Sequence, residues 1–192
     1  MLRAVSACSA APSHPLDGGL DIGGVDLTDP AAAARVVVQV AEAFRSLDTL
    51  INVTGGFVWQ PLADCAEDTW SRMFAMNAST CVNMIRAALP QLAASKDARI
   101  VNIGALGAKE AGAGMGAYAA SKGAVHRLTE SLAEELKGQD ITVNAILPSI
   151  IDTPTNRADM PMRILASGFS PGPSPMSSSS WLRRAPGQSA AP

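Results

Sequence analysis

The sequence predicts an α/β fold built on a parallel sheet, because short apolar runs alternate with longer segments of helical periodicity. Three of these runs are rich in β-branched residues and lie at residues 48–53, 99–103 and 141–147. Helical segments separate them, and this alternation is typical of right-handed βαβ units. The chain has 192 residues, of which 47% are hydrophobic and only 4% aromatic. That length suits one domain, and we expect its core to be aliphatic and alanine-rich.

The N-terminal part of the chain carries the weakest pattern. We expect residues 1–19 to be poorly structured, because they show no clear periodicity and contain Ser, Pro, His and Gly. A short apolar stretch follows at residues 22–27. Thr28 or Asp29 is then positioned to cap a helix over about 31–46, with a proline in its first turn.

The remaining elements follow in regular order. A buried strand at 48–53 is stopped by two glycines, and a helical region over about 66–95 comes next. The strand at 99–103 leads into a loop rich in Gly and Ala, and a helix then runs from about 116 to 136. The last strand, 141–147, is ended by a proline.

Ligands of parallel α/β sheets bind beyond the carboxyl ends of the strands. The residues of interest here fall at or just after such ends; they are Asp26, Asn52, Gly55, Ala105 and Pro148. We therefore expect the functional site at that edge of the sheet.

Tyr118 and Lys122 lie four residues apart in the stretch Y-A-A-S-K, so a helix places both on one face. An ammonium beside a phenol favours the phenolate, which lowers a pKa that is about 10 when unperturbed. Such a tyrosine suits general acid–base catalysis. The same spacing also describes an ordinary exposed helix pair, so the pair needs support from other segments.

Composition excludes several other classes of protein. The formal net charge of −2 gives no indication of nucleic acid or of a membrane surface as a partner. Cys8, Cys65 and Cys81 form no metal spacing and are typical of reduced thiols, so we expect a cytoplasmic protein without a metal site. No apolar run reaches the roughly 18 residues that span a bilayer.

Taken together, these segments resemble the short-chain dehydrogenase/reductase family over about residues 22–162. The matching segments stand in the family's order; they are Val25–Asp29, Leu47–Gly55, Met76–Ala78, Arg99–Ala105, Tyr118 with Lys122, and Ile141–Thr153. The resemblance implies an incomplete Rossmann-like doubly wound parallel sheet with helices on both faces. The corresponding domain covers residues 20–164, and a flexible tail rich in Ser and Pro follows at 165–192.

The resemblance also implies roles for individual residues. Tyr118 is the expected general acid, Lys122 is expected to hold a ribose and to depress the tyrosine pKa, and Asn77 is expected to position a relay water. The alternative for Asn77 is an asparagine that interrupts a helix and is satisfied by backbone. The implied cofactor is NAD or NADP, bound by Asp26, Leu27, Asn52, Gly55, Tyr118, Lys122, Pro148, Ile151 and Thr153.

The chain departs from the family where a catalytic serine is usual. Thirteen residues before Tyr118 stands Ala105, whose methyl group cannot polarise a substrate oxygen. The quinonoid dihydropteridine reductase branch manages without that serine, and the chain resembles it in Gly104-Ala105, in Gly123–His126 and in Asp152–Pro154. A pterin-like or otherwise activated acceptor is therefore the implied substrate, as a hypothesis.

The family's glycine-rich phosphate turn is a second departure. No T-G-x-x-x-G-x-G precedes Asp26, and Gly112-x-Gly114-x-x-Ala117 imitates a nucleotide motif too far beyond its strand. The C-terminal part departs as well, so both ends look truncated or replaced. The competing hypothesis is a non-catalytic remnant that binds no cofactor and acts only by association.

The helices at 66–95 and 116–136 resemble the family's interface helices. The resemblance thus implies a homodimer or homotetramer, and packing within one chain is the alternative. The expected partner in the site is a small-molecule substrate.

Overall fold

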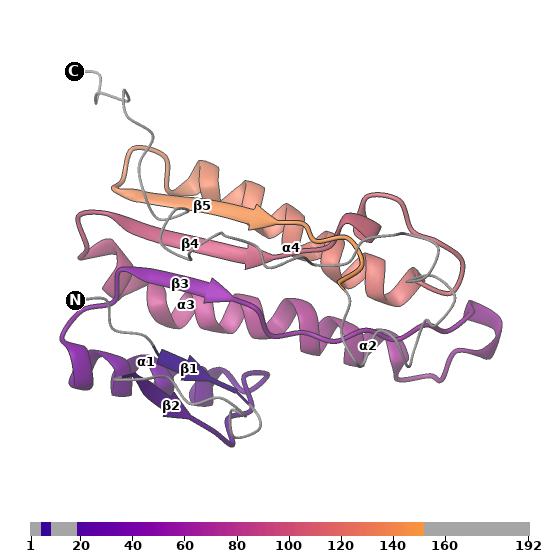
Figure 1. The fold of residues 1–192 in the computed structure, drawn as a ribbon, viewed down its shortest axis with the longest axis horizontal. Coiled ribbons are helices and arrows are strands. Elements are labelled where there is room, and N and C mark those ends of the chain that lie inside the picture. Colours follow the sequence, from indigo (N-terminus) through magenta and orange to yellow (C-terminus); the bar gives the residue numbers. More distant parts are fainter. Residues whose placement is uncertain (1–4, 9–18, 152–192) are drawn as a thin grey trace. The chain divides into compact units, whose positions relative to one another are not determined.

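The computed structural model describes residues 5–8 and 19–151, and everything below concerns these residues (Figure 1). The chain divides into two units, Met1–Ser149 and Ile150–Pro192. The elements all lie in the first unit. The expected tail at 165–192 falls outside the described residues.

Three parallel strands form the main sheet. They are β3 (Thr49–Asn52), β4 (Ala98–Ile103) and β5 (Ile141–Ile146), in the order β3-β4-β5. Leu50 lies opposite Ile100, and Ile100 lies opposite Val143, so these three side chains share one face of the sheet. All three strands were expected from their β-branched sequences, and the parallel pairing is confirmed.

A second, two-stranded sheet differs from the expectation for the N-terminus. β1 (Val5–Ala7) pairs in parallel with β2 (Leu20–Ile22), although residues 1–19 were expected to be poorly structured. The amide of Cys8 continues the ladder by donating to Ile22 O at 3.1 Å. A strand of three residues is too short to show period-two alternation, so the sequence of β1 does not reveal it as a strand. β1 forms because it pairs with β2.

Asp29 is the N-cap of α1 (Pro30–Phe44), and it was one of the two residues expected to cap this helix. Its carboxylate accepts hydrogen bonds from the amides of Ala31 and Ala32 at 2.9 and 3.2 Å. Thr28, the other candidate, instead donates to Asp26. The helix ends at Arg45, whose φ of 64° is the left-handed conformation common at helix ends.

The helical region expected over 66–95 is divided in the structure. A 3₁₀ turn, η1 (Leu62–Asp64), precedes α2 (Thr69–Phe74), and a π-helical turn, η2 (Ala75–Ser79), connects α2 to α3 (Thr80–Ala93). The π turn contains Asn77, which fits the expected helix-interrupting asparagine. A π turn widens a helix by one residue and frequently marks a functional site.

After β4, a second 3₁₀ turn, η3 (Leu106–Ala108), leads to α4 (Gly116–Glu135), which carries Tyr118. α4 contacts β4, β5 and α2, while α3 packs against α1, β3 and β4. α3 and α4 therefore lie on one face of the main sheet, behind its strands in Figure 1, and α1 packs against α3. One hydrophobic core joins them to the sheet through Leu50, Ile100 and Val143.

The opposite face of the sheet is less covered in the described residues. Ile51 is 53% exposed there, and Ile146 is 41% exposed. The predicted α/β class with a partial doubly wound parallel sheet is confirmed, and the part of the chain that the structure describes shows helices on one of the two expected faces.

Candidate active site

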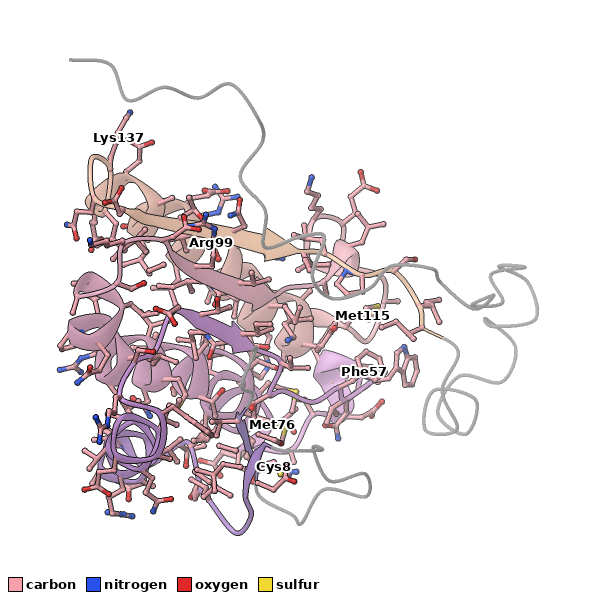
Figure 2. All side chains as sticks on the ribbon, turned by 60° about the vertical axis from the view of Figure 1, so that its left-hand side comes forward. Cys8, Phe57, Met76, Arg99, Met115 and Lys137 are labelled. Atoms are coloured by element: carbon pink, nitrogen blue, oxygen red, sulfur yellow. The ribbon has the colours of Figure 1, made fainter. Side chains whose placement is uncertain are left out.

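Several of the predicted residues lie at the carboxyl ends of β3, β4 and β5. Asn52 ends β3, and Gly55 follows it by three residues. The first turns of α4 bring Tyr118 and Lys122 to the same edge. Figure 2 shows Phe57 and Met115 together at this end, whereas Lys137, after the last turn of α4, lies at the opposite end.

Lys122 is buried, with 6% of its surface exposed, and its ammonium donates to Ile103 O at 2.8 Å. Burial lowers the pKa of Lys122, and the Cys81 thiol opposes this weakly. An ammonium has three donors, and the described residues supply this one acceptor. The ammonium therefore has donors that a ligand could use.

Asn77 is almost fully buried and bonds to the segment after β3. Its Oδ1 accepts from Gly56 N at 3.0 Å, and its Nδ2 donates to Gly56 O at 3.1 Å. The same Nδ2 donates to Ser121 Oγ at 3.0 Å. These contacts match the structural alternative for Asn77, in which backbone satisfies the side chain.

Gly55 lies against both of these polar groups. A Cβ added at Gly55 would overlap Asn77 Oδ1 and would come within 3.0 Å of Lys122 Nζ. Glycine is thus required by close approach and not by its φ, which is outside the left-handed region. Asn77 Oδ1 and Lys122 Nζ consequently both lie next to Gly55, in the space that a Cβ would take.

Ser121 is a site residue that sequence reasoning missed. It is fully buried, accepts from Asn77 and donates to Tyr118 O at 2.8 Å. It therefore ties the backbone of α4 at Tyr118 to the π turn. A serine next to Lys122 in the same motif was the available signal, but the motif alone does not reveal its partner.

Tyr118 differs from the expectation in its pKa. Burial raises the pKa of Tyr118. The ring packs edge-on against Phe57, with ring centroids 4.9 Å apart. The pKa of Tyr118 is thus shifted upward, opposite in direction to the expected depression by Lys122, and the phenol stays protonated at neutral pH.

Asn52 belongs to a buried polar network between the sheet and α4. Its Nδ2 donates to Asn102 Oδ1 at 2.8 Å, and Asn102 Nδ2 donates to Thr129 Oγ1 at 2.9 Å. The Cys81 thiol lies 3.4 Å from the same Asn102 oxygen, and burial raises the pKa of Cys81 to about 11. The Asn52 amide nitrogen is thus already engaged in a hydrogen bond within the protein.

Asp26 and Leu27 follow β2. The Asp26 carboxylate accepts from Thr28 N at 2.9 Å and from Thr28 Oγ1 at 2.6 Å, and the hydroxyl bond lowers the pKa of Asp26. Leu27 is buried, and its carbonyl accepts from Asn83 Nδ2 at 3.0 Å. Leu27 therefore offers backbone, not side chain, to any ligand here.

Ala105 is buried at the start of the loop after β4, and its amide donates to His126 Nε2 at 3.2 Å. Neither its side chain nor its amide is a donor for a substrate. Pro148 is half-buried and its carbonyl accepts from Leu106 N at 2.9 Å. Ile151 is exposed in the second unit, and Thr153 lies outside the described residues.

The glycine pattern at residues 112–117 does not form a phosphate turn. Gly114 has a φ of 75°, and its bare α-carbon faces the ring of Trp59. Trp59 Nε1 donates to Ala113 O at 2.9 Å, and Gln60 N donates to Gly114 O at 2.7 Å. The loop before α4 is therefore pinned by the segment after β3.

No group of three or more His, Cys, Asp or Glu side chains among the described residues is placed to hold a metal ion. No helix in this part of the chain is long and apolar enough to cross a membrane.

Comparison with known proteins agrees with this geometry. The family model for short chain dehydrogenase matches residues 10–163. Sorbitol dehydrogenase of Cereibacter sphaeroides is 32% identical over 129 residues, which are 67% of this chain and 50% of that protein. D-beta-hydroxybutyrate dehydrogenase of Rhizobium meliloti is 31% identical over 136 residues, which are 71% of this chain and 53% of that protein.

A solved structure of NAD+-bound xylitol dehydrogenase superposes with a TM-score of 0.67 at 28% identity. The match covers 72% of this chain and 54% of that one. The chain thus spans about half the length of the curated relatives that it matches.

Proposed function

Because this chain belongs to the short chain dehydrogenase family, we propose that it binds NAD or NADP and transfers hydride to a carbonyl- or imine-type small molecule. The observation that carries the proposal is the arrangement of Tyr118, Lys122 and Gly55 at one sheet edge. The xylitol dehydrogenase structure, which contains NAD+, supports the nicotinamide part of the proposal.

Tyr118 is the proton donor in this proposal. The nicotinamide would supply the hydride to the substrate carbon, and the Tyr118 hydroxyl would give its proton to the substrate oxygen or nitrogen. A raised pKa keeps this phenol protonated at neutral pH, which suits reduction. The phenolate left behind regains its proton from solvent.

Lys122, Asn52 and Gly55 are the proposed contacts for the nicotinamide half of the cofactor. Support comes from the two further donors of the Lys122 ammonium and from the bare backbone at Gly55. Asp26 and Leu27 are proposed for the adenine side. Pro148, Ile151 and Thr153 are proposed to cover the nicotinamide, as the resemblance implies.

Asn77 is also proposed to take part in a proton relay, because Asn77 Oδ1 and Lys122 Nζ both lie next to Gly55. Its hydrogen bonds to Gly56 fix where the amide lies. The relay would then use the amide group of Asn77, which these hydrogen bonds hold in place.

The proposed substrate is an activated acceptor, such as a quinonoid pterin. Ala105 brings no hydroxyl, and its amide is already bonded to His126, so Tyr118 is left to activate the substrate by itself. In other enzymes, removal of one such donor costs roughly 10²–10³ in rate, which an electron-poor imine can tolerate better than a ketone.

Association through the region 66–95 and α4 is proposed as well. Trp70 and Phe74 on α2 are 40% and 38% exposed, which supports an interface that includes this region. Sedimentation analysis tests the proposal, and a purely monomeric chain at about 50 μM would refute it.

Two measurements test the hydride-transfer proposal. NADH fluorescence reports cofactor binding, and loss of absorbance at the NADH band reports hydride transfer to quinonoid dihydropterin. Tyr118→Phe is expected to keep NADH binding and to lose about 10²–10⁴ in turnover. Lys137→Met is the matched control and should behave as wild type, because the Lys137 side chain is 76% exposed and its ammonium pairs with Glu134 on the surface.

The outcomes separate the alternatives. A folded chain that leaves NADH fluorescence unchanged would contradict the cofactor proposal and favour a non-catalytic remnant. A chain that binds NADH and reduces ketones but not the quinonoid pterin would refute the pterin class alone.

A further inference from the structure

His126 continues the face of α4 that carries Tyr118 and Lys122. The three residues stand at intervals of four, one turn apart. Lys122 Nζ holds Ile103 O, and His126 Nε2 accepts the amide of Ala105. α4 therefore grips the end of β4 at two points, on either side of Gly104.

The corner formed by Gly104 and Ala105 is enclosed on both sides. Gly104 N donates to Ile146 O at 2.9 Å, which fixes the corner to β5. On the other side, the imidazole of His126 lies so close to Gly104 that a Cβ would overlap its Nε2 and Cδ2 atoms. Glycine at this position thus lets the ring approach near enough to receive the Ala105 amide.

The bond to Ala105 requires a neutral imidazole with its proton on Nδ1, because a protonated Nε2 is a donor and cannot accept. The charged groups facing His126 are Arg127, Glu130 and Lys122 on α4 and Lys109 after η3. Burial lowers the pKa of His126, and the cations Arg127, Lys109 and Lys122 act in the same direction, while Glu130 opposes them. The neutral ring is consequently the favoured form near pH 7.

Protons reach this ring through a cleft of about 730 Å³ between α4 and β5. His126 lines the cleft together with Lys109, Arg127 and Glu130. The imidazole thus borders solvent on its outer side and the Ala105 amide on its inner side.

We propose that His126 is a positioning residue that holds the Gly104–Ala105 corner at the carboxyl end of β4 and releases it when the imidazole is protonated. The release reorients the peptide, because an imidazolium N–H and an amide N–H cannot face each other. The consequence for cofactor binding rests on the function proposed above, whereas the movement of the corner does not.

Two variants separate the hydrogen bond from the space that the ring fills. His126→Gln places an amide oxygen near the Nε2 position, which accepts from Ala105 at every pH. His126→Leu keeps a similar volume without an acceptor. Thermal unfolding confirms that each variant is folded before it is compared.

The first measurement needs no cofactor. The ¹⁵N–¹H resonance of Ala105 is followed from pH 8 to pH 5 in the full chain, together with the imidazole resonances of His126. We expect the Ala105 signal to shift with the His126 titration in wild type and to stay constant in His126→Gln. An Ala105 signal that ignores the His126 titration would overturn the proposal.

The second measurement is NAD+ binding by calorimetry over the same pH range. Wild type should bind about threefold to tenfold more weakly once His126 is protonated, the equivalent of one hydrogen bond, and His126→Gln should lose this dependence. His126→Leu should bind as weakly at pH 8 as protonated wild type does. Equal affinity and an equal pH profile in His126→Leu and wild type would refute the positioning role.

The two measurements fail independently. If the Ala105 signal behaves as expected but no variant binds NAD+, the cofactor proposal fails and the positioning role of His126 stands.

Discussion

Gly55→Ala is the sharpest test of how the site is assembled. The added methyl group would overlap Asn77 Oδ1 and would lie 3.0 Å from Lys122 Nζ. Lys122 is held by Ile103 O and Asn77 by Gly56, so neither side chain has a free direction of retreat. We expect Asn77 to give way, because its amide lies closer to the new atom.

The cost follows from the hydrogen bonds that Asn77 makes. Rotation of the amide breaks its two bonds to the Gly56 backbone, and the bond to Ser121 is strained with them. A buried polar group left without a partner costs about 1–3 kcal/mol. With partial relaxation, we expect Gly55→Ala to lower the free energy of unfolding by about 2–4 kcal/mol.

Gly123→Ala is the matched control for this substitution. A Cβ at Gly123 meets nothing within 4 Å, and the residue lies inside α4. Alanine there should raise the free energy of unfolding by about 0.5–1 kcal/mol through helix propensity. The same substitution chemistry is thus expected to act in opposite directions at the two sites.

Urea unfolding followed by tryptophan fluorescence measures both variants. The reasoning is refuted if Gly55→Ala is as stable as wild type, or if Gly123→Ala is destabilised to the same degree. Retained stability in Gly55→Ala would mean that Asn77 and Lys122 do not border Gly55 as described.

Other substitutions and titrations test separate parts of the structure. Tyr118 is the one tyrosine of the sequence, so tyrosinate absorbance reports it alone. Its pKa should lie above 10 in the folded chain and return to about 10 in urea. Any stability tied to the neutral phenol is therefore fully present below about pH 10 and is lost as the pH rises through the folded pKa. Cys81, with a pKa of about 11, has roughly one thiolate in a thousand at pH 8, so mass spectrometry should find it alkylated far more slowly than Cys65; comparable rates would contradict its burial. Asp29→Ala should cost about 1 kcal/mol in thermal unfolding, whereas Asp29→Asn should cost much less because it keeps the cap. Asn102→Leu should cost about 2–4 kcal/mol, because Asn52 and Thr129 lose their buried partner; a neutral result would show that the network is not formed.

Local sequence signals explain the parts of the fold that could be predicted. The strands at β3, β4 and β5 carry β-branched runs, and Asp29 with the proline after it marks the start of α1. Both signals depend on residues near each other in the chain. The shared face of Tyr118 and Lys122 was predictable for the same reason, since it follows from their spacing of four residues in one helix.

The parts that could not be predicted depend on contacts distant in sequence. The π turn at Asn77 is stabilised by Gly56, which is 21 residues away, and the acceptor of Ala105 is His126, also 21 residues away. β1 is three residues long and exists through its pairing with β2. The upward shift of the Tyr118 pKa was not predictable from the helix spacing, because it comes from burial of the phenol in the folded chain.

These contacts divide the roles of the two residues in the motif. Tyr118 is positioned from the backbone side, because Ser121 accepts from Asn77 and donates to the Tyr118 carbonyl. Lys122 is positioned by the end of β4 and keeps two donors for a ligand. Because the Tyr118 ring packs on Phe57 while Lys122 bonds to Ile103 O, loss of the Lys122 ammonium should affect cofactor binding before it affects the acidity of Tyr118. Burial keeps the Tyr118 phenol protonated and Lys122 has donors beyond its bond to Ile103 O, which supports the roles proposed for them as proton donor and cofactor contact.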